Sequence, residues 1–472
     1  MRPFFERLSR RKGELFLKFN GCNLFLGLLL SFNTISNAQQ TKHVILISID
    51  GFHPDMYTDM TWPAPNLRKL VKMGTYADHL LSVFPSYTYP SHTAMITGAY
   101  PARSRVYFNQ PKNSKGDWNW FTSAIRVPTL WQALKKDGLT TAAVEWPVSV
   151  NKDITWNMPE IWNNKYPDDR VTEARKYATP GLIEDIERNA TGKLDSSNFN
   201  DNYYTLDEDA GRAAAYIFKT KKPAFMAVHF ATVDGFEHEF GRDGDSVRMA
   251  LETNDRAIGD IMTAIQQSKE TDSTAIIIVG DHGFATIHTI MRPNMLIRSL
   301  PVRFLPAGGS AFLYHIRSAM MMSDHQLVKA VTDSLNSLPK DKRKLFRIID
   351  RKELDQMGAD SSTLLALTGV NASGLVFSGS TAPRQSENHG PGTLVQNNKL
   401  DGLFIPTTGG HHGYDPNNME MYTGFIAEGA GVVKGGHVKE LREVDIAVLI
   451  ANLLGVDFKT PDGKLVPGIL KL

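Results

Sequence analysis

The chain has 472 residues, with 52 basic and 50 acidic side chains and a formal charge of +2. This length allows one large α/β domain with insertions as well as two or three separate domains. The balanced charge argues against a nucleic-acid-binding surface or a polybasic membrane surface, so any affinity for an anion has to be local.

The first 38 residues differ in kind from the rest. A basic stretch precedes an apolar run over residues 24–32, which is short for a bilayer span and typical of a secretory signal. Ser36 and Ala38 are the small residues that a signal peptidase recognises, so we expect cleavage after Ala38 and export to the periplasm or the medium. An uncleaved amino-terminal anchor is the alternative. Cys22, the one cysteine of the chain, lies inside this segment, which leaves the mature chain without a thiol.

Strands and helices alternate from residue 43 onwards, as hydrophobic periodicity and helix-terminating glycines indicate. The expected strands are residues 44–49, 140–144, 224–230, 274–279, 311–315 and 424–427. The expected helices are residues 65–73, 91–97, 128–136, 210–218, 247–268, 323–337 and 444–454. Two stretches of weak periodicity, about 149–202 and 292–403, are predicted to be insertions. This order predicts an α/β domain over residues 39–472, with a mostly parallel central sheet.

Aspartates follow three of the predicted strands. Asp50 and Asp281 come directly or almost directly after a strand, and Asp234 lies a few residues beyond a third. Open α/β sheets place their ligands at the carboxyl ends of the strands. We therefore expect these three carboxylates to converge on one edge of the sheet.

Histidines accompany the aspartates. His238 lies four residues after Asp234, which is about one helical turn, and His282 adjoins Asp281 between two glycines. A further pair, His411 and His412, lies between glycines near the carboxyl terminus. Aspartate mixed with neutral imidazole suits divalent cations of the zinc type. Each residue alone is a weak signal, but the set predicts a two-metal hydrolase.

A threonine, Thr88, lies in the turn over residues 87–92 and is the candidate nucleophile. A free hydroxyl attacks poorly near neutral pH, whereas a divalent cation stabilises its alkoxide.

The order and spacing of these segments resemble the nucleotide pyrophosphatase/phosphodiesterase family of the alkaline phosphatase superfamily. The resemblance extends from about His43 to about Phe458. It rests on Ile47-Ser48-Ile49-Asp50-Gly51, Pro85-Ser86-Tyr87-Thr88-Tyr89-Pro90-Ser91-His92, Asp234-Gly235-Phe236-Glu237-His238, Asp281-His282-Gly283 and His412-Gly413-Tyr414-Asp415. It implies an alkaline-phosphatase-like α/β fold, with helices on both faces of the sheet and two insertions that form a cap over the active site.

The resemblance also implies two Zn²⁺ ions, or other divalent cations, and a phosphothreonine intermediate on Thr88. One ion would be bound by Asp234, His238 and His412. The other would be bound by Asp50, Asp281, His282 and the Thr88 oxygen. His412 is preferred over His411 because the family's histidine directly precedes Gly-Tyr.

Two further residues are expected to bind the substrate. Asn109 stands where the family binds a phosphoryl oxygen, and the alternative is that it only caps a loop. Tyr89 stands where relatives stack an aromatic ring on a nucleobase, its backbone N–H is a second expected donor, and core packing is the alternative for its ring. We assign no role to the histidines outside the ligand segments, His229 among them.

The expected substrate is a small phosphodiester or nucleotide. Phosphomonoesterases of the superfamily carry extra cations near the substrate, and residues 143–148 offer none, which favours diester or pyrophosphate cleavage. Arg105 keeps phosphomonoester or phosphonate hydrolysis as the alternative. A secreted metal-binding scaffold without activity is the non-enzyme alternative, although all the ligands are present. The physiological substrate and the oligomeric state stay open, and we expect no stable membrane anchor after signal cleavage.

Overall fold

The computed structural model describes residues 41–200, 204–316, 322–381 and 402–471. The expected signal segment, with Cys22, lies outside these residues. Contacts group residues 39–472 into one compact unit. Within the described ranges, no helix has both the length and the apolar character that crossing a membrane requires.

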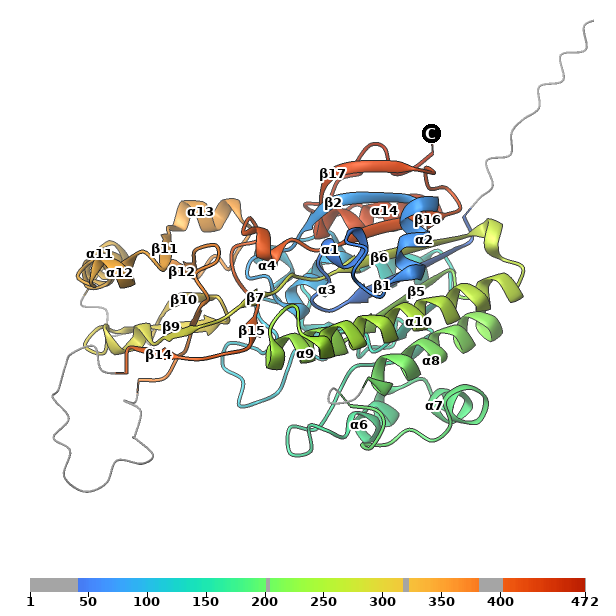
Figure 1. Cartoon of the computed structure of the whole chain (residues 1–472), viewed down its shortest axis with the longest axis horizontal. Coiled ribbons are helices and arrows are strands. Elements are labelled where there is room, and N and C mark those ends of the chain that lie inside the picture. Colours follow the sequence, from blue (N-terminus) through green and yellow to red (C-terminus); the bar gives the residue numbers. More distant parts are fainter. Residues whose placement is uncertain (1–40, 201–203, 317–321, 382–401, 472) are drawn as a thin grey trace, which may run out of the picture. The chain divides into compact units, whose positions relative to one another are not determined.

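A central sheet of eight strands organises the unit (Figure 1). In spatial order the strands are β17 (Gly436–Arg442), β2 (Thr75–Leu81), β16 (Phe425–Gly429), β6 (Thr274–Gly280), β1 (His43–Ile49), β5 (Phe225–Phe230), β3 (Thr141–Val144) and β4 (Trp156–Met158). Only β16 runs antiparallel to its neighbours. Every residue of β1, β5 and β6 is buried, as expected for strands that are covered on both faces. The predicted fold class, a mostly parallel α/β sheet, is confirmed.

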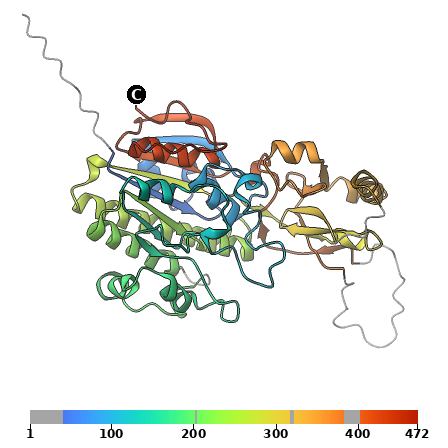
Figure 2. The same ribbon diagram turned by 180° about the vertical axis from the view of Figure 1, so that it is seen from behind.

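Helices cover this sheet in two groups, which Figures 1 and 2 show from opposite sides. One group packs around α10 (Asp245–Gln267) and contains α8 (Thr205–Lys221) and α2 (Pro65–Met73). The other packs around α3 (Thr88–Thr97) and contains α5 (Leu130–Lys136) and α14 (Ile446–Leu454). Contacts of α8 with β5 and of α14 with β1 place both groups directly on the sheet.

The second weakly periodic region has a sheet of its own. Its strands, in spatial order, are β11 (Phe346–Ile349), β12 (Ala366–Gly369), β10 (Ser310–His315) and β9 (Val302–Ala307). The helices are α11 (Asp324–Asn336), α12 (Lys340–Arg343) and α13 (Arg351–Gln356). A smaller sheet contains, in spatial order, the strands β13 (Leu375–Phe377), β8 (Thr289–Met291) and β14 (Phe404–Pro406). This region has an apolar core of its own, and the burial of those side chains stabilises the region.

The first weakly periodic region differs from the expectation in one respect. It supplies β4, the edge strand of the main sheet, which pairs in parallel with β3. Helices α6 (Arg170–Tyr177) and α7 (Leu182–Ile186) follow. A three-residue strand is too short to show period-2 alternation, which explains why the sequence did not predict it.

Candidate metal centre and active site

Three adjacent parallel strands position the carboxylates. β1 lies between β5 and β6, and Ile49 is in register with both Phe230 and Gly280. Asp50 directly follows β1 and Asp281 directly follows β6, so the two residues lie at the same level along neighbouring strands. Two residues after β5, the chain begins α9 (Thr232–Phe240), which carries Asp234 and His238 on consecutive turns. The expected convergence on one edge is thus a consequence of strand order and register.

The first ligand cluster is centred on the His282 ring. Its Nε2 lies 3.2 Å from Asp50 Oδ1 and 3.4 Å from Asp281 Oδ2. The Thr88 hydroxyl lies 3.5 Å from the same nitrogen. Asp50, Asp281 and His282 are all buried and offer ligand atoms close enough to bind one ion.

The second cluster is centred on Asp234. Its Oδ2 lies 3.4 Å from His238 Nε2, and its Oδ1 lies 3.6 Å from His412 Nε2. Each imidazole donates from Nδ1 to a backbone carbonyl, His238 to Gly410 at 3.2 Å and His412 to Ser86 at 2.9 Å. This backbone bond fixes the tautomer, so that each Nε2 presents a lone pair to the cluster.

The two clusters adjoin one another. The His282 and His412 rings stack with their centroids 3.6 Å apart, and His282 Nε2 lies 4.0 Å from Asp234 Oδ1. All seven residues expected to bind metal are therefore brought together: Asp50, Thr88, Asp234, His238, Asp281, His282 and His412.

The carboxylate oxygens fit a cation. Asp281 Oδ1 accepts from the backbone N–H groups of Gly51 at 3.2 Å and His282 at 3.0 Å. Asp281 Oδ2 and Asp50 Oδ1 are buried and have no hydrogen-bond partner among the described residues. An unpaired buried carboxylate oxygen is costly, and a divalent cation is the partner that would satisfy both. The donor set fits metal ions of the zinc type.

Burial also sets the charge states of the ligands. It raises the pKa of Asp50 well above its usual value, and the neighbouring Asp281 and Asp234 carboxylates raise it further. It lowers the pKa of His282 and His412 well below the usual value, and the neighbouring imidazoles contribute in the same direction. The neutral imidazoles are ready to bind a cation, whereas a protonated Asp50 carboxyl has to release its proton when a cation binds.

Thr88 is the first residue of α3 and is 8% exposed. The helix begins three residues earlier than expected because Pro90 falls in its first turn, where a missing N–H disrupts no helical bond. The Tyr89 backbone N–H donates to Asn109 Oδ1 at 3.0 Å and is therefore already bonded, contrary to our expectation of a free donor. Asn109 is held beside the nucleophile by this bond, and its amide NH₂ is the donor that remains.

A cavity of about 470 Å³ opens onto this centre. Aromatic rings of Tyr87, Phe108 and Trp118 line it, together with Asn109, Lys112, Leu305, Pro306, His238, His411, His412 and others of residues 110–114. Leu305 and Pro306 belong to β9, so the second weakly periodic region forms part of the cavity wall. A larger cavity of about 890 Å³ lies between α11 and the strands of that region, and no expected site residue lines it.

Tyr89 is the expected site residue whose predicted role the structure contradicts. Its ring is fully buried, its hydroxyl donates to Glu160 Oε1 at 3.3 Å, and Trp118 packs edge-on against it. A ring with no exposed face cannot stack on a base, so the core-packing alternative holds for Tyr89. Trp118, which covers it, lines the cavity instead.

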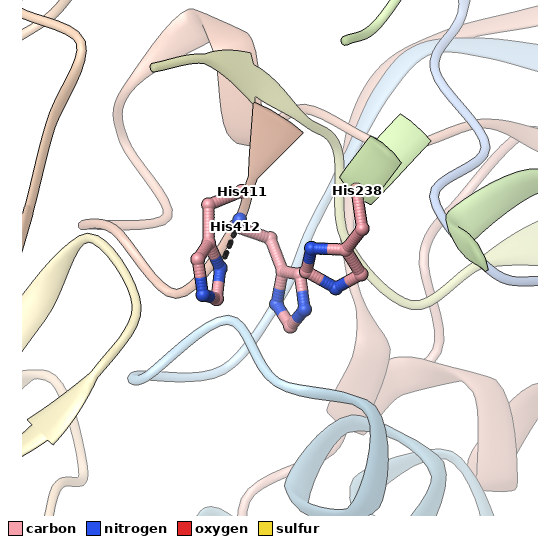
Figure 3. A group of neighbouring side chains, drawn as sticks. All are labelled: His238, His411 and His412. Carbon is pink, nitrogen blue, oxygen red and sulfur yellow. Dashed lines mark hydrogen bonds between the residues drawn. The ribbon is translucent and has the colours of Figure 1, made fainter. Parts of the chain in front are cut away.

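His411 lies beside His238 and His412 (Figure 3). Its Nδ1 accepts from the His412 backbone N–H at 3.0 Å, and its ring lies edge-on to His238. The ligand atoms of His238, His411 and His412 lie close enough together to bind one ion, so the preference for His412 over His411 stays a prediction.

His229, to which the sequence analysis assigned no role, touches the site. It lies near the end of β5 and its Nε2 is 3.2 Å from Asp50 Oδ2. A histidine in an otherwise apolar strand, next to a strand that ends in an aspartate, was the signal that could have identified it.

The fold and the two ligand clusters define an alkaline-phosphatase-like α/β protein with a candidate two-metal centre. The chain belongs to the type I phosphodiesterase/nucleotide pyrophosphatase family, whose sequence model matches residues 44–389. This match confirms the resemblance that the motifs carry.

Known relatives agree with this assignment. Venom phosphodiesterase 2 of Crotalus adamanteus is 24% identical over 423 residues, which cover 87% of this chain and 45% of the venom protein. Ectonucleotide pyrophosphatase/phosphodiesterase family member 7 of Rattus norvegicus is 22% identical over 458 residues, which cover 92% of this chain and 87% of the relative. The chain thus spans less than half the length of the venom phosphodiesterases that it matches.

Solved structures share the fold. Human ectonucleotide pyrophosphatase/phosphodiesterase 5 superposes with a TM-score of 0.62 at 16% identity, over 89% of this chain and 97% of that one. An inactive variant of the murine protein, solved in complex with AMP, superposes with the same TM-score at 15% identity.

Proposed function

We propose that this protein is an exported, metal-dependent phosphodiesterase or nucleotide pyrophosphatase that acts through a phosphothreonine intermediate on Thr88. The observation that carries the proposal is the position of the Thr88 hydroxyl, 3.5 Å from His282 Nε2 and next to two clusters of carboxylate and imidazole ligands. Family membership and the complex of a murine relative with AMP point to the same substrate class.

Two zinc ions are the proposed cofactors. Asp50, Asp281 and His282, with the Thr88 oxygen, would bind one, and Asp234, His238 and His412 would bind the other. When bound, the ions supply Lewis-acid stabilisation of negative charge on the phosphoryl group and on the attacking and leaving oxygens.

The chain's own residues orient the reaction. Thr88 Oγ1 forms a bond to phosphorus while the bond from phosphorus to the leaving oxygen breaks, and the hydroxyl proton passes through solvent to the leaving oxygen. Water then attacks the phosphothreonine, and Thr88 recovers its hydroxyl. Asn109, fixed through the Tyr89 N–H, directs its amide NH₂ to a non-bridging phosphoryl oxygen.

Diester cleavage is favoured over monoester cleavage by the charges around the cavity. The monoester alternative rested on the positive charge of Arg105. This side chain donates to the Tyr107 hydroxyl at 2.7 Å and is not among the described residues that line the cavity. Lys112 lines it, but its Nζ lies 2.6 Å from the buried Asp360 carboxylate, which offsets its charge. A monoester dianion would find no uncompensated cation among these side chains.

Kinetics on a matched substrate pair tests the diester preference. The zinc-loaded protein should cleave a bis-aryl phosphate with a higher kcat/KM than the aryl monoester. The reverse order would favour the phosphomonoesterase alternative.

Removing the nucleophile tests the mechanism. Thr88→Ala should lower turnover by at least about 10³-fold, since residual rates without a nucleophile come from binding and electrostatics alone. Its zinc content, measured by elemental analysis, should stay near two equivalents, and Thr88→Ser should retain activity. A protein that binds zinc but lacks turnover even in the wild type would support the scaffold alternative.

A further inference from the structure

Asp207 is a buried carboxylate that lies outside the two ligand clusters. It is near the start of α8, is 1% exposed, and accepts hydrogen bonds on both oxygens. Its Oδ1 accepts from the Ala231 backbone N–H at 2.9 Å, and its Oδ2 accepts from the Thr232 backbone N–H at 2.9 Å. The Thr232 hydroxyl and, at 2.8 Å, the Asn254 amide also donate to Oδ2.

These bonds cap the amino terminus of α9. Its first N–H groups have no partner within the helix, and the helix dipole favours a negative charge beside them. The residue before the helix, Ala231, has no side chain that could accept from them. Burial raises the pKa of Asp207, and all four hydrogen bonds oppose that rise. Asp207 therefore supplies, from another helix, the cap that α9 lacks in its own sequence.

The helices that hold Asp207 form a tightly packed base. Asn254 belongs to α10, and α10 packs against both α8 and α9 (Figure 1). An added Cβ at Gly211 of α8 would lie 2.5 Å from the Cβ of Ala257 of α10, so these two helices are in close contact. The Asp207 carboxylate joins the start of α9 to this base.

Two of the three residues expected to bind the ion of the second cluster lie on α9. Asp234 is the third residue of the helix, and His238 follows one turn later. The two bonded N–H groups belong to the residue before the helix and to its first residue, so they fix the backbone just before Asp234. Metal ligands have to be held within roughly 0.5 Å of their binding geometry, which makes the position of this helix end important.

We infer that Asp207 is a positioning residue, which fixes the start of α9 and so places Asp234 and His238 for metal binding. This inference rests on the proposed two-metal function. It concerns one of the two ions, because the carboxylates of the other cluster follow β1 and β6 and do not lie on α9. Outer residues that orient metal ligands typically contribute 10- to 100-fold to metal affinity.

Asp255 provides a matched control on a helix that carries no expected metal ligand. It is also 1% exposed and caps α2, where its Oδ2 accepts from the Asn66 backbone N–H at 3.0 Å and its Oδ1 from the Leu67 backbone N–H at 2.9 Å. The Asn66 side chain donates to Oδ2 as well, at 3.0 Å, as the Thr232 hydroxyl does at Asp207. A substitution at Asp255 thus removes the same kind of cap from a different helix.

The test is a zinc titration of the full-length protein in competition with a chromogenic chelator. The amide of Asp207→Asn has one acceptor oxygen, so at least one N–H of the α9 terminus is left unpaired. The variant should lower the affinity for one of two ions by about 10-fold or more. This ion should be the one whose affinity His238→Ala also lowers. Asp255→Asn should lower the temperature of thermal unfolding, as Asp207→Asn does, and leave both zinc affinities unchanged.

A milder pair of variants decides the question if Asp207→Asn does not fold. Thr232→Ala removes the hydroxyl that donates to Asp207 and keeps the backbone N–H. Asn66→Ala removes the corresponding side-chain donor to Asp255. Thr232→Ala should weaken binding of the same ion to a smaller extent, and Asn66→Ala should weaken binding of neither.

The possible results lead to different conclusions. If the wild type binds two zinc ions and Asp207→Asn, or Thr232→Ala in its place, binds both as tightly, the positioning role is wrong. An equal loss of affinity in Asp207→Asn and Asp255→Asn would also overturn it, because that pattern reports general destabilisation. The same holds for a loss at the ion that His238→Ala spares. If the wild type binds fewer than two ions, the two-metal proposal itself fails, and the inference with it.

Discussion

At the scale of single residues, hydrogen bonds to the backbone fix the candidate metal ligands. One Asp281 oxygen accepts from two backbone N–H groups, while its second oxygen and Asp50 Oδ1 face His282. In the second cluster, backbone carbonyls accept from the Nδ1 atoms of His238 and His412. Residue type was readable from the sequence, but which atom of each side chain faces the metal was not.

Trp118 is half-buried and lines the cavity, whereas the Tyr89 ring is buried, and this difference predicts which of the two rings affects substrate affinity. Trp118→Ala should raise the KM for a diester that bears an aromatic group by roughly 5-fold or more, since aromatic stacking contributes about 1–3 kcal/mol. The value of kcat should change little, because stacking far from phosphorus stabilises the ground state and the transition state alike.

Tyr89→Phe is the matched control for this measurement. It removes a buried hydroxyl and leaves the shape of the cavity wall intact, so KM should stay at the wild-type value. A KM that rises in Tyr89→Phe and not in Trp118→Ala would restore the original interpretation of Tyr89.

At the scale of elements, α3 determines where the nucleophile lies. All of its residues are buried, Thr88 begins it, and Gly98 ends it in the left-handed conformation with φ of +63°. A Cβ at Gly98 would lie 2.4 Å from both Cβ and Cγ2 of Thr460. The position therefore requires glycine both for its backbone conformation and for its close approach to the carboxyl-terminal segment.

Two glycines with similar φ but different surroundings allow the cost of the backbone conformation to be measured separately from the cost of the close contact. Gly138, just after α5, has φ of +72°, and no atom lies within 4 Å of the place that an added Cβ would occupy. Gly138→Ala should lower the free energy of unfolding by about 1–2 kcal/mol, the cost of the left-handed conformation. Gly98→Ala should cost more, because the clash with Thr460 adds to it. Urea denaturation measures both, and equal losses would show that Thr460 simply moves away.

At the scale of the whole molecule, the buried ligand cluster couples stability to pH and to metal. Burial raises the pKa of Asp281 from 3.8 to about 8, and the Asp234 carboxylate contributes in the same direction. The folded metal-free protein therefore retains a proton that the unfolded chain has lost. Its stability is greatest below the unfolded pKa and falls as the pH rises through the folded pKa.

This coupling predicts that the metal-free protein loses stability between pH 6.5 and pH 8.5, by up to about 1.4 kcal/mol per pH unit for each retained proton. Above pH 6.5 the neutral histidines do not oppose the trend, since their lowered pKa values affect stability only at lower pH. Zinc should abolish the loss, because it replaces the proton.

Thermal unfolding at the two pH values, with zinc and with a chelator, measures this effect. Asp281→Asn should reduce the pH dependence of the metal-free protein, since the amide does not titrate while the buried Asp50 carboxyl still does. A metal-free wild type that is equally stable at pH 6.5 and pH 8.5 would contradict the assignment of a retained proton.

The sequence by itself determined the alternation of strands and helices, the aspartates at the strand ends and the family, because these depend on local periodicity and on short motifs at fixed spacing. It did not predict three strands of the main sheet, β2, β17 and the three-residue β4, nor the burial of Tyr89 and the contact of His229 with Asp50. Those depend on which side chain covers which: Trp118 buries Tyr89, and the pairing of β5 with β1 brings His229 to Asp50. Only the tertiary structure decided these, because burial and hydrogen-bond partners come from residues far apart in the chain.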